Sequence, residues 1–171
     1  MIVVLLGYMA SGKSTIGRTL ATQLNYEFLD LDDEISERLK MEIPEIFQKK
    51  GELFFRKKET EVLQDVLQSK SNLVLALGGG TPCYGTNMEL IKEATPASFY
   101  LQLSISSLTQ RLTNEKDNRP LVAHLDAEEL PEFLGKHLFE RASFYSQAAH
   151  TIVADTKEVD EIVDEIKEIL I

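Results

Sequence analysis

Five consecutive apolar residues, from Ile2 to Leu6, precede Gly7, and a second apolar run without polar alternation covers residues 73–77. Such runs are typical of parallel strands that are buried on both faces. Shorter strands are expected at 26–29, 97–103 and 151–154. Between the strands, apolar residues recur at helical spacing. We therefore predict helices over residues 13–24, 33–40, 43–49, 52–68, 87–93, 106–113, 128–147 and 159–170.

The alternation of strands and helices predicts an α/β fold with a doubly wound parallel sheet, whose ligands bind at the carboxyl ends of the strands. A chain of 171 residues suffices for one domain, so a single domain over residues 1–171 is expected. Residues 114–126 are polar and contain Arg119-Pro120, which predicts a loop. Six phenylalanines are expected to pack in the core or in a substrate-binding region: Phe47, Phe54, Phe55, Phe133, Phe139 and Phe144.

The stretch after the first strand fits the phosphate-loop template G-x-x-x-x-G-K-[ST]. Its glycines allow several backbone N–H groups to surround a polyphosphate at the start of a helix, where the helix dipole favours negative charge. Lys13 then offers a point charge to the outer phosphates, and the Ser14 hydroxyl is a ligand for Mg²⁺. The alternative is a glycine turn with a solvated lysine. The predicted ATP-binding residues of this loop are Gly7, Ala10, Ser11, Gly12, Lys13, Ser14 and Thr15.

The overall charge changes the range of expected partners. With 28 acidic and 18 basic residues the net charge is −10, which disfavours nucleic acid because binding to its backbone needs a basic face. A single cysteine, Cys83, excludes an internal disulfide and is typical of a reducing compartment. We find no leader sequence and no apolar run near the ~18 residues of a membrane span. A cytoplasmic protein without nucleic-acid or membrane partners is therefore expected.

Two aspartates, Asp30 and Asp32, follow the strand expected at 26–29. In extended backbone, residues two apart point to the same side, so both carboxylates would face the phosphate site. There they could hold Mg²⁺ through water and bind or deprotonate an acceptor hydroxyl. The alternative is that they cap the following helix. Because capping accounts for one aspartate and not for both, we favour a functional role for the pair.

Two arginines lie on helix faces that are otherwise mostly apolar. Arg56 shares a stripe with Leu63, and Arg141 shares one with Leu134. Burying a guanidinium costs several kcal/mol unless it is paired. Glu59 is the natural internal partner of Arg56, and a substrate carboxylate is an additional one. For each arginine alone a structural ion pair is an equal alternative, whereas the two together favour an anionic substrate.

Three consecutive glycines, Gly78, Gly79 and Gly80, follow the apolar run at 73–77. Without side chains, their backbone can approach a ligand closely, and the alternative is a bare loop. The polar loop at 114–126 is predicted to be a lid, whose Arg119 reaches the transferring phosphate when closure excludes water. Arg111, on the preceding helix, either flanks the nucleotide or is a solvated surface residue.

Together and in this order, these segments resemble the shikimate kinases. The resemblance runs from end to end of the chain and rests on the phosphate loop, Phe28-x-Asp30-x-Asp32, Gly51-Glu-x-x-Phe55-Arg56-x-x-Glu59, the glycine triplet, Arg119-Pro120-Leu121 and Arg141-x-x-x-Tyr145. It implies a three-layer fold like that of nucleoside monophosphate kinases, with a five-stranded parallel sheet and helices on both faces. It also implies a substrate-binding subdomain at about 33–60 and a lid at about 113–125.

The same resemblance implies an ATP-dependent small-molecule kinase that phosphorylates the 3-hydroxyl of shikimate, a step towards chorismate and the aromatic amino acids. ATP and shikimate are then the expected partners, Mg²⁺ the expected cofactor and a monomer the expected state. The implied catalytic residues are Lys13, Asp32 and Arg119, with Asp32 as the base. The implied metal-site residues are Ser14 and Asp30, and Arg111 and Arg119 would join the ATP site. The implied substrate-binding residues are Asp32, Arg56, Gly78, Gly79, Gly80 and Arg141.

Two alternatives remain at this point. One is another small-molecule kinase of similar build, such as a gluconate kinase. The other is a non-catalytic nucleotide-binding module, which the paired aspartates and the two arginines disfavour because such a module needs neither. Within the phosphate loop, Ala10 stands where many shikimate kinases have a glycine, and this departure is expected to alter the loop conformation slightly.

Overall fold

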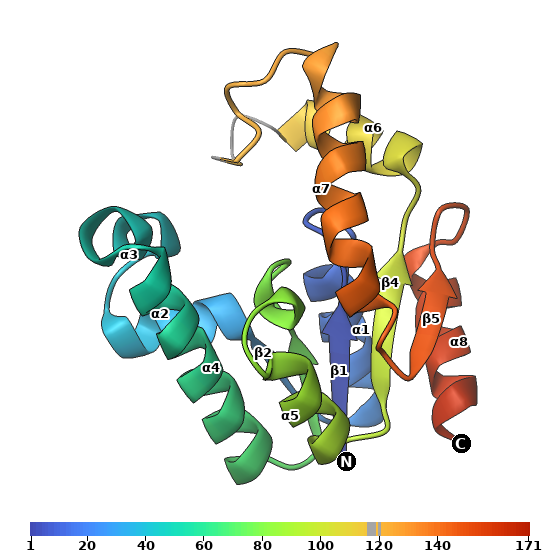
Figure 1. Cartoon of the computed structure of the whole chain (residues 1–171). Coiled ribbons are helices and arrows are strands. Elements are labelled where there is room, and N and C mark those ends of the chain that lie inside the picture. The colour runs from blue at the N-terminus through green and yellow to red at the C-terminus, as the bar shows by residue number, and fades with distance from the viewer. Residues whose placement is uncertain (116–118, 120) are drawn as a thin grey trace.

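The computed structural model describes residues 1–115, 119 and 121–171 (Figure 1). One parallel sheet has the strand order β2-β3-β1-β4-β5. Its central strands are buried on both faces, whereas the edge strands β2 and β5 are partly exposed. The predicted five-stranded parallel sheet is therefore confirmed. The strands are β1 (Ile2–Leu6), β2 (Glu27–Asp30), β3 (Leu73–Ala76), β4 (Ser98–Gln102) and β5 (His150–Val153).

The strand order places the loops after β1 and β3 next to each other. β1 pairs with β3 from Ile2 opposite Leu73 to Leu5 opposite Ala76. After β1 the chain moves to the β2 edge, whereas after β3 it crosses β1 to reach β4. In open α/β sheets, ligands bind at such a switch point, outside the carboxyl ends of the strands. The phosphate loop and the glycine triplet occupy this position.

Helices cover both faces of the sheet, which confirms the three-layer fold. In Figure 1, α1 (Lys13–Leu24) and α8 (Val159–Leu170) lie behind the sheet and pack against each other. The front of the sheet carries α5 (Asn87–Ala94) and the lower end of α7 (Glu129–Tyr145), and α4 (Glu52–Ser69) packs against α5.

Two further groups of helices project beyond the sheet. Beside the β2 edge, α2 (Leu31–Leu39) and α3 (Ile43–Lys50) pack on α4, and at the top of the view α6 (Ile105–Glu115) packs on α7 (Figure 1). Pro44 lies in the first turn of α3, where its missing N–H costs no helical hydrogen bond. None of the described helices is long and apolar enough to cross a membrane.

Some local predictions were wrong. Helix α2 begins two residues earlier than expected, because Asp30 caps it by accepting a hydrogen bond from the backbone N–H of Asp32. A 3₁₀ turn, η1 (Thr81–Cys83), follows the glycine triplet and was not predicted. Phe139 is 84% exposed, because it lies off the buried face of α7. Helix α6 continues to Glu115, so the predicted loop is shorter, and Pro120 lies outside the described residues.

Candidate active site

The glycines of the phosphate loop have the backbone geometry that the template requires. Gly7 has φ +153° and Gly12 has φ +92°, values that residues with a side chain rarely adopt. A Cβ at Gly7 would also lie 2.8 Å from the carbonyl oxygen of Leu101. Ala10 is left-handed too, with φ +62°, which costs about 1–2 kcal/mol for a residue with a Cβ. A glycine at position 10 would avoid this strain.

Lys13 is buried beneath the loop and is not a solvated lysine. Its ammonium group donates hydrogen bonds to the carbonyl oxygens of Gly7 at 2.8 Å and Tyr8 at 2.9 Å, and to Ser11 Oγ at 3.4 Å. Burial lowers the pKa of Lys13 to about 8, although the carboxylates of Asp32 and Asp30 act in the opposite direction. The group is therefore still mostly protonated at pH 7, and its charge lies where little water screens it.

Ser14 and Asp30 bring two oxygen donors together at the start of α1. The Ser14 hydroxyl donates to Asp30 Oδ2 at 2.8 Å, while Oδ1 of the same carboxylate caps α2. Asp30 therefore caps α2 with one carboxylate oxygen and accepts from Ser14 with the other, so the capping alternative applies to Asp30 and still leaves room for the predicted role at a metal ion. A hydroxyl and a carboxylate are hard oxygen ligands of the kind that Mg²⁺ prefers, so this donor set fits the expected ion.

Asp32 also lines the cavity near Lys13, but its backbone is helical and not extended as predicted. It is the second residue of α2 and not part of an extended strand, so the two-residue alternation does not apply. Burial raises the pKa of Asp32 to about 6, and the neighbouring carboxylates of Asp30 and Glu59 contribute in the same direction. A carboxyl group with a pKa near the working pH is suited to accept a proton from a substrate hydroxyl.

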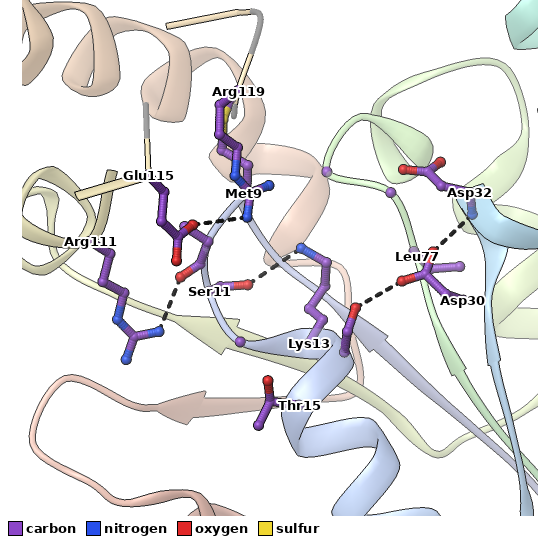
Figure 2. A pocket seen from close by; sticks show the side chains of 15 residues that line it. Met9, Ser11, Lys13, Thr15, Asp30, Asp32, Leu77, Arg111, Glu115 and Arg119 are labelled. Carbon is purple, nitrogen blue, oxygen red and sulfur yellow. Dashed lines mark hydrogen bonds and ion pairs between the residues drawn. The ribbon is translucent and has the colours of Figure 1, made fainter. Parts of the chain in front are cut away.

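These residues line a cavity of about 540 Å³ (Figure 2). Lys13, Asp30 and Asp32 lie on one side, and Arg111, Glu115 and Arg119 reach it from α6 and the segment that follows. Of the lining residues, Met9, Leu77 and Glu115 were not predicted; Met9 lies within the phosphate loop and Leu77 precedes the glycine triplet, whereas no sequence signal marks Glu115. Among the residues that the structure describes, those that line the cavity are Met9, Ala10, Ser11, Gly12, Lys13, Ser14, Thr15, Asp30, Asp32, Leu77, Gly78, Gly79, Arg111, Glu115 and Arg119.

Two arginines that line this cavity, one on α6 and one after it, make different contacts. Arg111 Nη1 donates to the carbonyl oxygen of Ala10 at 3.0 Å, so it flanks the phosphate loop and is not merely a solvated residue. Arg119 forms an ion pair with Glu115, with Nη2 and Oε2 3.2 Å apart. Its charge also contributes to the lowered pKa of Lys13. This wall of the cavity therefore carries two guanidinium groups and one carboxylate, in a protein whose net charge is −10.

Each glycine of the triplet lies against one predicted functional side chain. A Cβ at Gly78 would lie 2.9 Å from Asp32 Oδ1, one at Gly79 would lie 3.2 Å from Arg141 Nη1, and one at Gly80 would lie 2.7 Å from Arg56 Nη2. Ordinary side-chain contacts are longer than these distances. The absence of side chains at 78–80 thus leaves the space in which one carboxylate and two guanidinium groups converge.

Arg56 is paired internally and also faces the triplet. Its Nη1 donates to Glu59 Oε1 at 2.8 Å, as the three-residue spacing predicted. Its guanidinium carbon lies 3.9 Å from the centre of the Tyr84 ring, a cation–π contact that the sequence did not indicate. Phe55 is buried and lies against the same guanidinium group. Arg56 therefore forms its ion pair with Glu59 and lies beside Gly80 at the same time.

Arg141 belongs to an aromatic cluster that sequence reasoning missed. The buried Tyr145 donates a hydrogen bond from its hydroxyl to the carbonyl oxygen of Gly79 at 2.6 Å, and burial raises the pKa of Tyr145. The Arg141 guanidinium lies 5.8 Å from the Tyr8 ring centre, and the Tyr8 hydroxyl is hydrogen-bonded to His137 Nδ1 at 2.8 Å. Helix α7 is thus attached both to the glycine triplet and to the phosphate loop.

Four predicted site residues, Gly7, Gly80, Arg56 and Arg141, do not line the 540 Å³ cavity. Arg56 instead lines a neighbouring cavity of about 600 Å³. The charges of Arg141 and Arg56 nevertheless reach the first cavity, because Arg141 helps to lower the pKa of Lys13 and Arg56 opposes the raised pKa of Asp32. Because Gly78, Gly79 and Gly80 are consecutive, the side chains of Asp32, Arg141 and Arg56 that lie against them are also close to one another.

A phosphate loop at the end of the first strand and a second, arginine-lined region beneath a glycine triplet define a phosphate-loop kinase for small molecules, with the fold of nucleoside monophosphate kinases. Residues 9–171 match the family model described as shikimate kinase. The chain belongs to the shikimate kinase family.

Individual members of this family are similar to the chain over nearly its whole length. The shikimate kinase of Flavobacterium psychrophilum is 48% identical over 168 residues, which cover 98% of each chain. The crystal structure of shikimate kinase from Bacteroides thetaiotaomicron has a TM-score of 0.92 at 33% identity and covers 99% of this chain and 98% of its own. Shikimate kinase from Acinetobacter baumannii in complex with shikimate has a TM-score of 0.86 at 35% identity, covering 99% and 92%.

Proposed function

We propose that this protein transfers the γ-phosphoryl group of ATP to the 3-hydroxyl of shikimate. The observation that carries the proposal is the convergence of Asp32, Arg141 and Arg56 on the three glycines, next to the buried Lys13. Shikimate is an anionic triol, so a carboxylate for its hydroxyls and two guanidinium groups for its carboxylate match its chemistry. The solved structure of the Acinetobacter baumannii relative with bound shikimate supports the same substrate.

In the proposed reaction the 3-hydroxyl oxygen forms a bond to the γ-phosphorus while the bond to the β,γ-bridging oxygen breaks. The hydroxyl proton passes to Asp32, and ADP leaves. Lys13 and Arg119 stabilise the negative charge on the transferring group, and the loop N–H groups hold the remaining phosphates. Arg56 and Arg141 hold the acceptor by its carboxylate. The glycine triplet lets the acceptor approach the backbone closely.

The finer assignments belong to the same proposal. Members of this family use ATP, and we assign Mg²⁺ as the ion, held by Ser14 and through water by Asp30. Such an ion neutralises charge on the β- and γ-phosphates when it is bound. We also propose that residues of about 33–60 form the acceptor-binding subdomain, that about 113–125 form a lid, and that the protein acts as a cytoplasmic monomer.

The proposal is tested by measuring ADP formation with purified protein, Mg²⁺ and ATP, with and without shikimate. Shikimate should increase ADP formation, and the product should be shikimate 3-phosphate by mass spectrometry and NMR. Gluconate serves as the control acceptor and should cause no increase. ADP formation that is insensitive to shikimate over a wide concentration range would contradict the proposal, and stimulation by gluconate would favour the alternative kinase.

The raised pKa of Asp32 predicts an acid limb in the pH profile. If Asp32 accepts the proton, only its ionised form is active, so kcat/KM for shikimate should fall tenfold per pH unit below about pH 6. An ordinary carboxyl group titrates near pH 4, about two units lower. Asp32→Asn should lose most of its turnover, and the residual activity should lack this limb. An acid limb centred near pH 4 in the unmodified protein would argue against Asp32 as the base.

A further inference from the structure

Three polar side chains next to the active site are almost completely buried. Glu59 is 1% exposed, and Thr81 and Asn87 are 0% exposed. None of the three lines the cavity that holds Lys13 or the neighbouring cavity that holds Arg56. Burying polar groups is unfavourable unless each finds a hydrogen-bond partner. The hydrogen-bond partners of Glu59, Thr81 and Asn87 therefore indicate what these three side chains contribute to the site.

The three side chains form a continuous chain of hydrogen bonds that ends at Arg56. Thr81 Oγ1 donates to Glu59 Oε2 at 2.8 Å, while Glu59 Oε1 accepts from Arg56 Nη1 at 2.8 Å. Asn87 Nδ2 donates to the carbonyl oxygen of Thr81 at 2.9 Å, and Asn87 Oδ1 accepts from Thr60 Oγ1 at 2.8 Å. Both oxygens of the Glu59 carboxylate are thus used, and both ends of the Asn87 amide are used.

These bonds attach the turn after the glycine triplet to helix α4. Thr81 opens η1, and its N–H donates to the carbonyl oxygen of Gly78 at 3.1 Å, so it closes the turn formed by the triplet. Thr60 and Glu59 belong to α4, which also carries Arg56. Asn87 is the first residue of α5 and bridges the turn and α4. The chain of bonds therefore fixes Gly80 and Arg56 relative to each other.

Arg56 depends on this support because it has few other polar contacts. Its Nε is buried and has no hydrogen-bond partner, and its distance to Glu52 Oε1 is 3.8 Å. Its remaining contacts are the bond to Glu59 and cation–π contacts with Tyr84, Phe55 and Phe47, which do not fix the direction of its N–H groups as a hydrogen bond does. The guanidinium also lies close to Gly80, since a Cβ there would be 2.7 Å from Nη2.

We propose that Thr81 and Asn87 are positioning residues for the carboxylate of the acceptor, acting through Glu59 on Arg56. Thr81 orients the Glu59 carboxylate, and Asn87 holds Thr81 in place. Neither residue touches the acceptor. The inference rests on the proposed role of Arg56 as a ligand of the acceptor carboxylate.

The first test replaces Thr81 by valine, which has nearly the same shape but lacks the hydroxyl donor. Loss of this one hydrogen bond to a charged group should raise KM for shikimate about tenfold, with less than about twofold change in KM for ATP. Thr81→Ser keeps the hydroxyl and should restore the KM of the unmodified protein. The matched control is Thr86→Val, because Thr86 is exposed and lies on the same segment before α5.

A change of substrate separates positioning from general damage to the fold. The analogue in which a hydroxymethyl group replaces the carboxylate of shikimate cannot use the guanidinium charge. We therefore expect Thr81→Val to lower kcat/KM about tenfold for shikimate but less than about twofold for the analogue. Equal losses for both acceptors, or an equal rise in KM for ATP, would overturn the proposal.

Asn87→Leu provides a second and independent variant with nearly the same volume. It should give the same selective loss for shikimate, because the Thr81 carbonyl is left without its donor. An unchanged KM for shikimate in a protein that unfolds at the same temperature as the parent would also overturn the proposal. Failure of the proposed function itself is distinguishable, because it would appear as absent shikimate phosphorylation in the unmodified protein.

Discussion

Turnover is expected to fall about a thousandfold when Lys13 is replaced by methionine, a loss of ~4 kcal/mol of transition-state stabilisation. Methionine keeps most of the buried aliphatic stem, so the change removes mainly the charge. That charge is effective because burial keeps water away from it, and the same burial lowers its pKa to about 8. Measuring kcat at saturating ATP and shikimate tests the prediction directly.

The ammonium group of Lys13 also has a structural role, and the measurement must distinguish it from the proposed role in catalysis. It donates hydrogen bonds to the carbonyl oxygens of Gly7 and Tyr8, so its loss can loosen the loop and weaken ATP binding. A fluorescent ATP analogue would report this effect as a change in Kd. Lys57→Met, at an exposed position on α4, is the matched control and should leave kcat unchanged. Near-normal kcat in the Lys13 variant would remove the phosphate-loop assignment.

The local parts of the site were predictable because they depend on short spacings. The loop from Gly7 to Ser14 carries its own backbone geometry, so its template is nearly sufficient. The pair of Arg56 and Glu59 follows from the spacing of neighbours on one helix face. The apolar runs at β1 and β3 predicted buried parallel strands, since both of their faces are covered by helices.

The parts that were missed depend on contacts between segments that are distant in the sequence. The bond from Thr81 to Glu59 spans 22 residues and the bond from Tyr145 to Gly79 spans 66, so neither leaves a periodic signal. The misassigned geometry of Asp32 has a local cause, because the backbone was expected to stay extended as far as Asp32, whereas Asp30 ends β2 and caps α2, so that the helix already begins at Leu31. Only the tertiary structure shows that one carboxylate caps a helix and contacts Ser14 at the same time.

The raised pKa of Asp32 illustrates a conflict between stability and function. Its carboxyl group would titrate near pH 4 in the unfolded chain, whereas burial and two neighbouring carboxylates raise its pKa to about 6 in the folded protein. Between these pH values the folded state binds more protons, so the contribution of this group to stability decreases as pH rises. The fold thus maintains an unfavourably buried charge at neutral pH, which the proposed role of Asp32 as a general base requires.

KM for shikimate is expected to rise about a hundredfold when Arg141 is replaced by alanine, while KM for ATP changes less than about twofold. Arg141 is the clearer of the two arginines for this test, because its charge has no ion-paired carboxylate partner among the described residues. Steady-state kinetics with each substrate varied in turn gives both constants. Lys136→Ala, on an exposed face of α7, is the control and should change neither.

The role of Arg56 must be tested with a different set of variants, because removal of its side chain leaves the Glu59 carboxylate buried without its cationic partner. Breaking such a pair costs about 3–5 kcal/mol of stability, so Arg56→Met alone would combine lost binding with partial unfolding. Adding Glu59→Gln removes the orphaned charge and should restore most of the thermal stability, but it should not restore KM for shikimate. Recovery of both would show that Arg56 stabilises the fold and does not bind the acceptor. Equal losses of shikimate and ATP binding in the Arg141 variant would assign that arginine, too, to the fold alone.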